Sequence, residues 1–199
     1  NIRESDAICQ VIRVFSDPDV VHVEGRVDPR DDIEIINTEL ILADLQTVEK
    51  ALPRLEKEAR LNKERAGILE ETKRAYEALQ RGTTIFAAGL DREVLRELFL
   101  LTAKPVLYVC NVDENAAKTG NEYTKKIEEI AREEGAEMLV IAAKTEEDIA
   151  SLETYEDKKM FLDELGLEES GVNRLIKKAY TLLNLETFIT AGEMEVKAW

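Results

Sequence analysis

Three short, nearly unbroken apolar runs constrain the fold of this chain most, at residues 7–15, 105–110 and 138–143. Each run has the length of a strand, and none shows the strict alternation of apolar and polar residues that a half-exposed strand has. Such runs are typical of strands buried on both faces of a parallel sheet. The sequence therefore predicts a parallel sheet.

Helical patterns stand between and after these runs. Apolar residues recur every three or four positions in 123–131 and again in 172–183. Ser170, just before the second range, is a suitable N-cap. Strands that alternate with helices are typical of an α/β domain with right-handed crossovers.

The middle of the chain predicts a helical hairpin instead. Residues 37–81 show no strand pattern, but two apolar stripes have coiled-coil spacing, one at Leu45, Val48, Leu52, Leu55 and Ala59 and the other at Ile68, Thr72, Ala75 and Leu79. The polar residues 62–64 form a connection so short that the two helices must pack side by side and antiparallel. We expect a coiled-coil insertion at 37–81 in an α/β domain formed by 1–36 and 82–199. The stripes serve either as core for the two helices alone or as part of an arm that also docks a partner.

Charge and composition exclude several classes of protein. Lys and Arg number 27 and Asp and Glu 42, which gives a net charge of −15. Such a chain is no general binder of nucleic acid, although a local basic patch stays open. No apolar run approaches the roughly 18 residues of a membrane span, and no signal peptide is visible, so we expect a cytoplasmic protein. We also expect Cys9 and Cys110 to be buried thiols, and the segment 20–32, with its single histidine His22, to be a loop.

Polar residues follow two of the expected strands directly. Asn111, Val112, Asp113 and Glu114 come after the second apolar run, and Ala142, Ala143 and Lys144 end the third. Ligands of open parallel sheets bind at the carboxyl ends of the strands. We therefore expect these two loops to lie side by side and to form the functional site.

The two loops carry a family resemblance. The Asn-x-x-Glu tetrad at 111–114, followed about thirty residues later by Ala-Ala-Lys, resembles the fourth and fifth base-recognition motifs of P-loop GTPases. The segments LLTAKPVLYVCNVDE, LGLEESGVNRLIKKAY and TAGEMEVKAW, together with the run from DPDVVHVEGRVDPRDD onward, are similar to the Obg-like ATPase family known as YchF. The similarity covers essentially the whole sequence.

The resemblance implies the second half of a Ras-like P-loop NTPase sheet with an inserted α-helical coiled-coil hairpin. In the family, the phosphate-binding loop and both switch regions precede the position of Asn1, and a TGS domain follows that of Trp199. The printed sequence contains no G-x-x-x-x-G-K-[ST] motif. The Mg²⁺ ligands are therefore expected in the N-terminal part of the family protein, and this chain alone is expected to be inactive. No catalytic residue and no metal ligand is assigned to it.

The resemblance also implies a role for each loop residue. Six residues would bind the cofactor, ATP or GTP: Asn111, Val112, Glu114, Ala142, Ala143 and Lys144. Asn111 would tie the loops together and face the purine, Val112 would give an apolar contact where GTPases have lysine, and Glu114 replaces the aspartate that grips guanine.

In the second loop, Ala143 would offer its main chain to position six of the purine, and Lys144 would cover a ring face. Ala142 replaces the serine common in the family motif, which predicts a more loosely packed loop. The implied parent is a redox-neutral, nucleotide-hydrolysing switch protein with a ribosome or RNA partner. Two alternatives stay open, a guanine-preferring GTPase and a noncatalytic coiled-coil interaction module with a protein partner for its hairpin.

Overall fold

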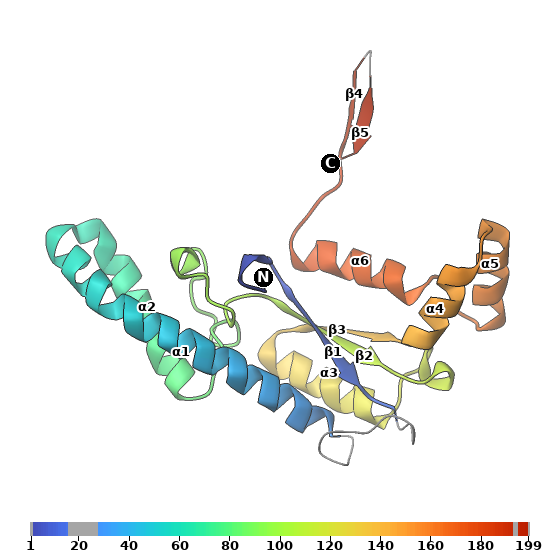
Figure 1. The fold of residues 1–199 in the computed structure, drawn as a ribbon, viewed down its shortest axis with the longest axis horizontal. Helices are drawn as coiled ribbons and strands as arrows, with labels where there is room; N and C mark the ends of the chain where they lie inside the picture. The colour runs from blue at the N-terminus through green and yellow to red at the C-terminus, as the bar shows by residue number, and fades with distance from the viewer. Residues whose placement is uncertain (1, 16–27, 193–194, 199) are drawn as a thin grey trace.

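The computed structural model describes residues 2–15, 28–192 and 195–198 (Figure 1). Three parallel strands form a sheet in the order β1 (Ile8–Arg13), β2 (Val106–Asn111) and β3 (Glu137–Ile141). The register aligns Val11 with Val109 and Val109 with Leu139. The predicted α/β fold class with a parallel sheet is confirmed.

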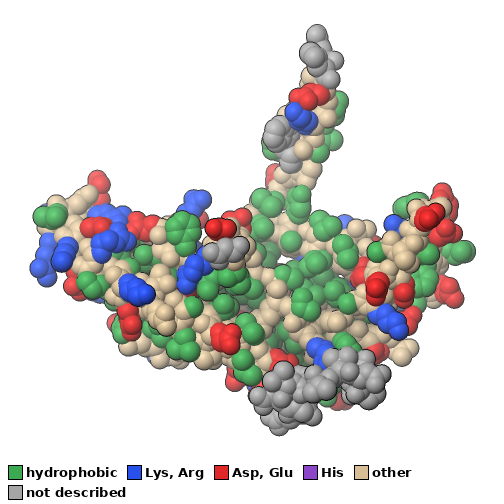
Figure 2. Space-filling model, in the orientation of Figure 1, with side chains coloured by type: hydrophobic (Ala, Val, Ile, Leu, Met, Phe, Trp, Pro, Cys, Tyr) green, Lys and Arg blue, Asp and Glu red, His purple; other side chains and the backbone are tan. Residues whose placement is uncertain are grey.

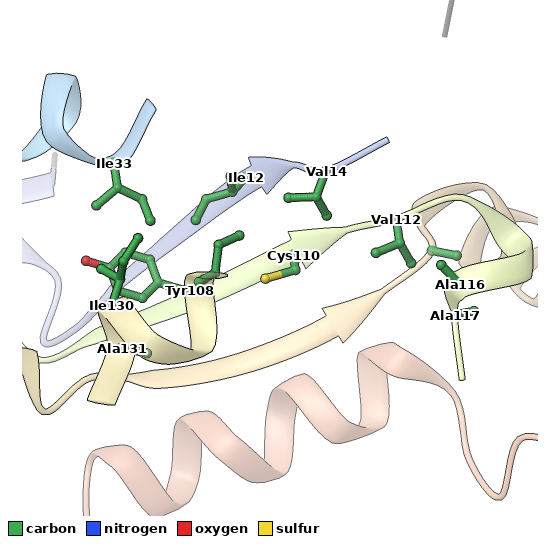
Figure 3. Close-up of a cluster of buried hydrophobic side chains, with 12 residues drawn as sticks. Ile12, Val14, Ile33, Tyr108, Cys110, Val112, Ala116, Ala117, Ile130 and Ala131 are labelled. Carbon is green, nitrogen blue, oxygen red and sulfur yellow. The ribbon is translucent and has the colours of Figure 1, made fainter. Parts of the chain in front are cut away.

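Helices pack on both faces of this sheet. On one face, α3 (Glu122–Glu134) and the start of α1 (Pro29–Leu61) bury a cluster that includes Ile12, Tyr108 and Cys110 (Figure 3). On the other face, α6 (Gly171–Leu182) packs Leu175 and Leu182 against residues of β2 and β3. The remaining helices after β3 are α4 (Ala143–Ser151) and α5 (Tyr155–Glu164), and one-turn 3₁₀ helices are η1 (Ile2–Glu4), η2 (Lys63–Arg65), η3 (Arg96–Leu98) and η4 (Glu114–Ala116).

The edge strand β1 differs from the prediction, because only one of its faces is covered. Ile8 and Ile12 are buried, whereas Val11 is 65% exposed and Cys9 is also exposed. The cause is its position: α6 lies over β2 and β3, and no described helix covers this face of β1. The expectation of a buried Cys9 is therefore wrong, while that of a buried Cys110 is confirmed.

The inserted hairpin is a long arm made of α1, η2 and α2 (Ala66–Gln80) (Figure 1). Its first helix begins at Pro29, eight residues before the expected boundary at 37. The Asp28 carboxylate accepts a hydrogen bond from the Arg30 amide at 3.2 Å, and Pro29 stands in the first turn. Residues 28–32, expected in a loop, therefore begin a helix, since Asp and Pro favour helix starts as well as turns. The rest of that segment, with His22, lies outside the described residues, and the division into domains stays a prediction.

The core of the arm contains more than the two predicted stripes. Val48 and Leu55 of α1 pack with Ala75 and Leu79 of α2, as the spacing predicts. The same cluster includes side chains from the connection back to the sheet, Ile85, Leu95, Leu98 and Leu100. The part of the arm around Val48 and Leu79 therefore packs against this connecting segment and is not an independent pair of helices.

A buried carboxylate joins α1 to the segment that leads into β2. Asp44 has no exposed surface, and its oxygens accept hydrogen bonds from the Leu101 amide at 2.9 Å and the Thr102 amide at 2.7 Å. The Thr102 hydroxyl donates a third hydrogen bond at 2.8 Å. Buried charges persist in proteins when their hydrogen bonds are satisfied in this way.

The chain ends in a small antiparallel hairpin of β4 (Ile189–Ala191) and β5 (Val196–Ala198). This hairpin projects from the body of the molecule after α6 (Figure 1). Among the described residues, no helix is long and apolar enough to cross a membrane.

Candidate functional site

The loops after β2 and β3 lie side by side, as expected for neighbouring parallel strands. Asn111, the last residue of β2, is in register with Ile141, the last residue of β3. The pairing continues one residue further, because the Val112 amide donates a hydrogen bond to the Ile141 carbonyl at 2.8 Å. Both loops therefore leave the same edge of the sheet.

Asn111 bridges the two loops. Its Oδ1 accepts a hydrogen bond from the Ala143 amide at 2.9 Å, at the first residue of α4. The N-cap residue Ala142 has no side-chain oxygen for this purpose, and the amides of a first helical turn need a partner from elsewhere. Asn111 therefore joins the two loops, as the resemblance implies, and the β2 loop supplies the cap that the β3 loop lacks; its contact with a purine stays a prediction.

Glu146 holds the second loop from the other side. Its carboxylate accepts hydrogen bonds from the Gly171 amide at 2.6 Å and the Val172 amide at 3.0 Å, at the start of α6. A negative charge at a helix N-terminus is also favoured by the helix dipole. A Cβ at Gly171 would lie 2.8 Å from Cγ2 of Ile141 and from Oε1 of Glu146, so this close approach requires glycine. Sequence reasoning missed this contact, because no local pattern connects Glu146 with residues 25 positions away.

Glu114 and Lys144 present their side chains to solvent. Both are exposed, and neither has a hydrogen bond or ion pair in the described part of the chain. Asp113 is occupied, since its Oδ1 accepts a hydrogen bond from the Ala116 amide at 3.2 Å and caps η4. Asn111, Glu114 and Lys144 are therefore among the polar side chains at this edge that can contact a ligand.

Three expectations about the loops are corrected by this geometry. Val112 is 4% exposed and packs with Ala116 and Ala117 in the core below the loop, so its side chain cannot lie against a base (Figure 3). The Ala143 N–H already donates to Asn111, so the main-chain contact expected from Ala143 cannot use this donor. Ala142 is 3% exposed in a loop held from both sides, and the loose packing expected from the missing serine hydroxyl is not found.

This edge suits an uncharged, flat ligand group better than a metal ion. The described residues contain no group of three or more His, Cys, Asp or Glu side chains that could hold a metal. An amide, a carboxylate and an ammonium group stand instead around two short loops. Such a donor and acceptor set can hydrogen-bond the edge of a purine and cover its face.

Comparison with known proteins gives matches along the whole chain. No family model matches it. It is 49% identical to "Ribosome-binding ATPase YchF" of Bacillus subtilis (strain 168) and 43% identical to the protein of the same name in Escherichia coli O157:H7, with 100% of the chain covered in both. It covers 56% and 55% of these two proteins, so the chain spans about half the length of the curated relatives it matches.

A solved structure agrees with these sequence matches. The structure of the Schizosaccharomyces pombe YchF GTPase has a TM-score of 0.84 and 32% identity, and the match covers 99% of this chain and 55% of that one. The parallel sheet, its helical insertion and this likeness define an α/β protein of the P-loop GTPase class. Within that class, the chain belongs to the Obg-like family that contains the YchF proteins.

Proposed function

We propose that this chain supplies the purine-base-binding loops of a nucleotide-hydrolysing protein, and that its preferred nucleotide is ATP. The observation that carries the proposal is the Asn111 bridge, which joins the two strand-end loops into one surface. Relatives named as ribosome-binding ATPases, 49% and 45% identical over the whole chain, support it. The central part of such a protein would hold the base, while phosphate binding and Mg²⁺ belong to residues outside the printed sequence.

Each exposed side chain has a role in this proposal. The Oδ1 atom of Asn111 already accepts a hydrogen bond from Ala143, so its Nδ2 group donates to a purine ring nitrogen. The aliphatic part of the Lys144 side chain covers a face of the ring. Glu114 determines which purine fits. We assign no base contact to Val112 and Ala142, because both side chains are buried.

Base preference follows from the length of the Glu114 side chain. Guanine is gripped when one carboxylate accepts hydrogen bonds from both N1–H and the 2-amino group. Glutamate is one methylene longer than the aspartate that makes this contact in GTPases, so its two oxygens do not reach both donors together. A good bidentate contact to a base is worth about 1 to 3 kcal/mol. Its loss removes the usual preference for guanine and leaves adenine unaffected.

The cellular role that we propose rests on the named relatives. The intact protein would hydrolyse ATP and bind the ribosome, as the names of the Bacillus and Haemophilus proteins state for those relatives. Mg²⁺ as its metal and the cytoplasm as its location are further parts of our proposal. The Schizosaccharomyces protein is described as a GTPase, which favours GTP as the second candidate nucleotide.

Calorimetric titration of ATP and of GTP into the full-length protein decides between the two nucleotides. We expect wild-type protein to bind ATP at least as tightly as GTP, and Glu114→Asp to shift the ratio toward GTP by roughly fivefold or more. Glu147→Asp makes the same chemical change at another exposed position and should leave the ratio unchanged. A wild-type preference of about tenfold for GTP, or no shift in the Glu114 variant, would refute the assignment.

A further inference from the structure

The amino-terminal end of α6 is fastened to the carboxyl end of β3 and to the helix that follows it. Both carboxylate oxygens of Glu146 take part, because Oε1 accepts the Gly171 N–H at 2.6 Å and Oε2 accepts the Val172 N–H at 3.0 Å. Two residues further along α6, Nη2 of Arg174 donates to the Val140 carbonyl at 2.9 Å. Hydrogen bonds to a charged group are about twice as strong as neutral ones. Glu146 is therefore a strong link between α4 and α6.

Glu146 also completes the N-terminus of α6. The first N–H groups of a helix have no partner within that helix. In α6 the Ser170 hydroxyl accepts the Asn173 N–H at 3.2 Å, and Glu146 accepts the N–H groups of the two residues before it. These N–H groups are thus satisfied by the protein itself. The end of α6 is occupied by a side chain of α4, and it is not a vacant site for an anion.

The packing of α6 on the sheet leaves its position along the sheet to these polar contacts. Within α6, which lies wholly in the described part of the chain, Gly171 is the one buried residue. The hydrophobic residues on one side of the helix pack against β2 and β3, whereas Ile176 and Tyr180 on the other side are 51% and 43% exposed. Hydrophobic side chains accordingly show at the surface below the C-terminal hairpin, in the middle of Figure 2. Apolar packing is not directional, so the hydrogen bonds of Glu146 and Arg174 fix where α6 begins relative to α4.

The first turn of α4 carries the second base loop, and this turn has two anchors. Asn111 holds Ala143 from the β2 loop, and Glu146 ties the same turn to α6. The two α4 residues are three positions apart, about 4.5 Å along the helix axis. Lys144 stands between them, exposed and with no hydrogen bond or ion pair in the part of the chain that the structure describes. With both anchors in place, the turn has little freedom to rotate, so the direction in which the Lys144 side chain leaves the helix is fixed.

We propose that Glu146 is a positioning residue of the base site, which aligns Lys144 with the purine ring through the contact between α4 and α6. The inference rests on the proposed function, in which Lys144 covers a face of the ring. Glu146 itself contacts no ligand, because both of its oxygens bind α6. A lysine over an exposed aromatic ring contributes about two- to fivefold to affinity. Loss of Glu146 should therefore weaken the part of the nucleotide affinity that comes from the base and leave the part from the phosphates unchanged.

Titration calorimetry of the full-length protein with ATP and with inorganic tripolyphosphate separates these two parts, since tripolyphosphate has no base. The test variant is Glu146→Gln, which keeps the length of the side chain but loses its charge and one acceptor oxygen. Glu147→Gln is the matched control, because it removes the same charge from an exposed side chain without a described partner. We expect Glu146→Gln to bind ATP about two- to fivefold more weakly and tripolyphosphate as wild type does. The control should match wild type with both ligands.

Combination with Lys144→Ala shows whether Glu146 acts through this lysine. When the Lys144 side chain is absent, Glu146→Gln should cause no further change in the ratio of ATP affinity to tripolyphosphate affinity, because the effects of coupled residues do not add. Gly171→Ala disturbs the same contact from the side of α6, since its Cβ would lie 2.8 Å from Oε1 of Glu146. It should reproduce the loss seen in Glu146→Gln. Circular dichroism and urea unfolding verify that each variant is folded under the conditions of the titration.

Two results overturn the positioning role. One is an unchanged ratio of the two affinities in Glu146→Gln, whether both affinities stay constant or fall together. The other is a fall in the ratio that is equally large with and without the Lys144 side chain. Failure of the proposed function is read from Lys144→Ala alone: if this variant keeps the wild-type ratio, the lysine makes no contact with the base. If Lys144→Ala lowers the ratio and Glu146→Gln does not, the base contact stands and only the positioning role is wrong.

Discussion

Replacing Asp44 with alanine should destabilise the protein more than any other single carboxylate truncation on the arm. The side chain is completely buried, and its removal leaves the amides of Leu101 and Thr102 and the Thr102 hydroxyl without acceptors. An unsatisfied buried donor costs about 1 to 3 kcal/mol. The nearby Arg3 guanidinium, 3.7 Å away, has a side chain that is 34% exposed and can turn to water, so it adds little. We expect Asp44→Ala to lower the free energy of unfolding by about 3 to 5 kcal/mol.

Urea unfolding followed by circular dichroism measures this loss in the 199-residue chain. A loss of that size is a large part of the 5 to 15 kcal/mol typical of a domain, so the midpoint should fall sharply while the slope stays constant. Glu56→Ala on the same helix is the matched control, because Glu56 is exposed and without a described partner. It should change stability by less than about 0.5 kcal/mol. If both variants lose equally little, the three hydrogen bonds do not hold the arm to the sheet.

Two further measurements follow from the described pKa shifts. Burial raises the pKa of the Cys110 thiol to about 12. A thiol reagent at pH 8 should therefore modify exposed Cys9 in the native chain and Cys110 only after unfolding. Equal labelling of the two thiols in the native chain would contradict the burial of Cys110. Because Arg65 lowers the pKa of Glu58 and Glu97, the cluster of these three residues stabilises the fold above the ordinary pKa of glutamate, and this contribution is lost as the pH falls through the lowered values. Urea unfolding of wild type and Arg65→Gln from pH 7 to about pH 3 should therefore show that the difference between their free energies of unfolding shrinks as the pH falls. A difference that does not depend on pH would refute the stabilising role of this cluster.

The sequence predicts features that depend on local pattern and on strand order. The neighbourhood of Asn111 and Ala143 followed from the rule that parallel strands end at the same edge, and the helix pairing of Val48 and Leu55 with Ala75 followed from spacing alone. The start of α1 was misassigned because Asp28 and Pro29 are compatible with a turn and with a helix start, and only the following turns of backbone decide between them.

Other features depend on contacts that no local pattern encodes. Val11 is apolar, but its burial depends on which helix covers its face of the sheet, and α6 stops short of β1. The roles of Glu146 and Asp44 depend on amides 25 and 57 positions away. A charged residue on an amphipathic helix is most simply expected in solvent. Their function as acceptors could therefore be established only in the folded chain.

The contacts of Asp44 also bear on how the arm is joined to the candidate site. A second, partly buried connection joins the same helix to the sheet through α3. The Tyr108 hydroxyl of β2 donates to the carboxylate of Glu134 in α3, which also accepts a hydrogen bond from the side-chain amide of Asn37 in α1 at 3.3 Å. Burial raises the pKa of the Tyr108 phenol, so it stays protonated as the donor. The arm is thus fastened to the segment just before β2, at Leu101 and Thr102, and through Glu134 of α3 to Tyr108 within the strand, whose last residue is Asn111. Rotation of the arm root against this segment would leave the Asp44 carboxylate without its three donors, and this cost holds the root of the arm to the chain that leads into β2.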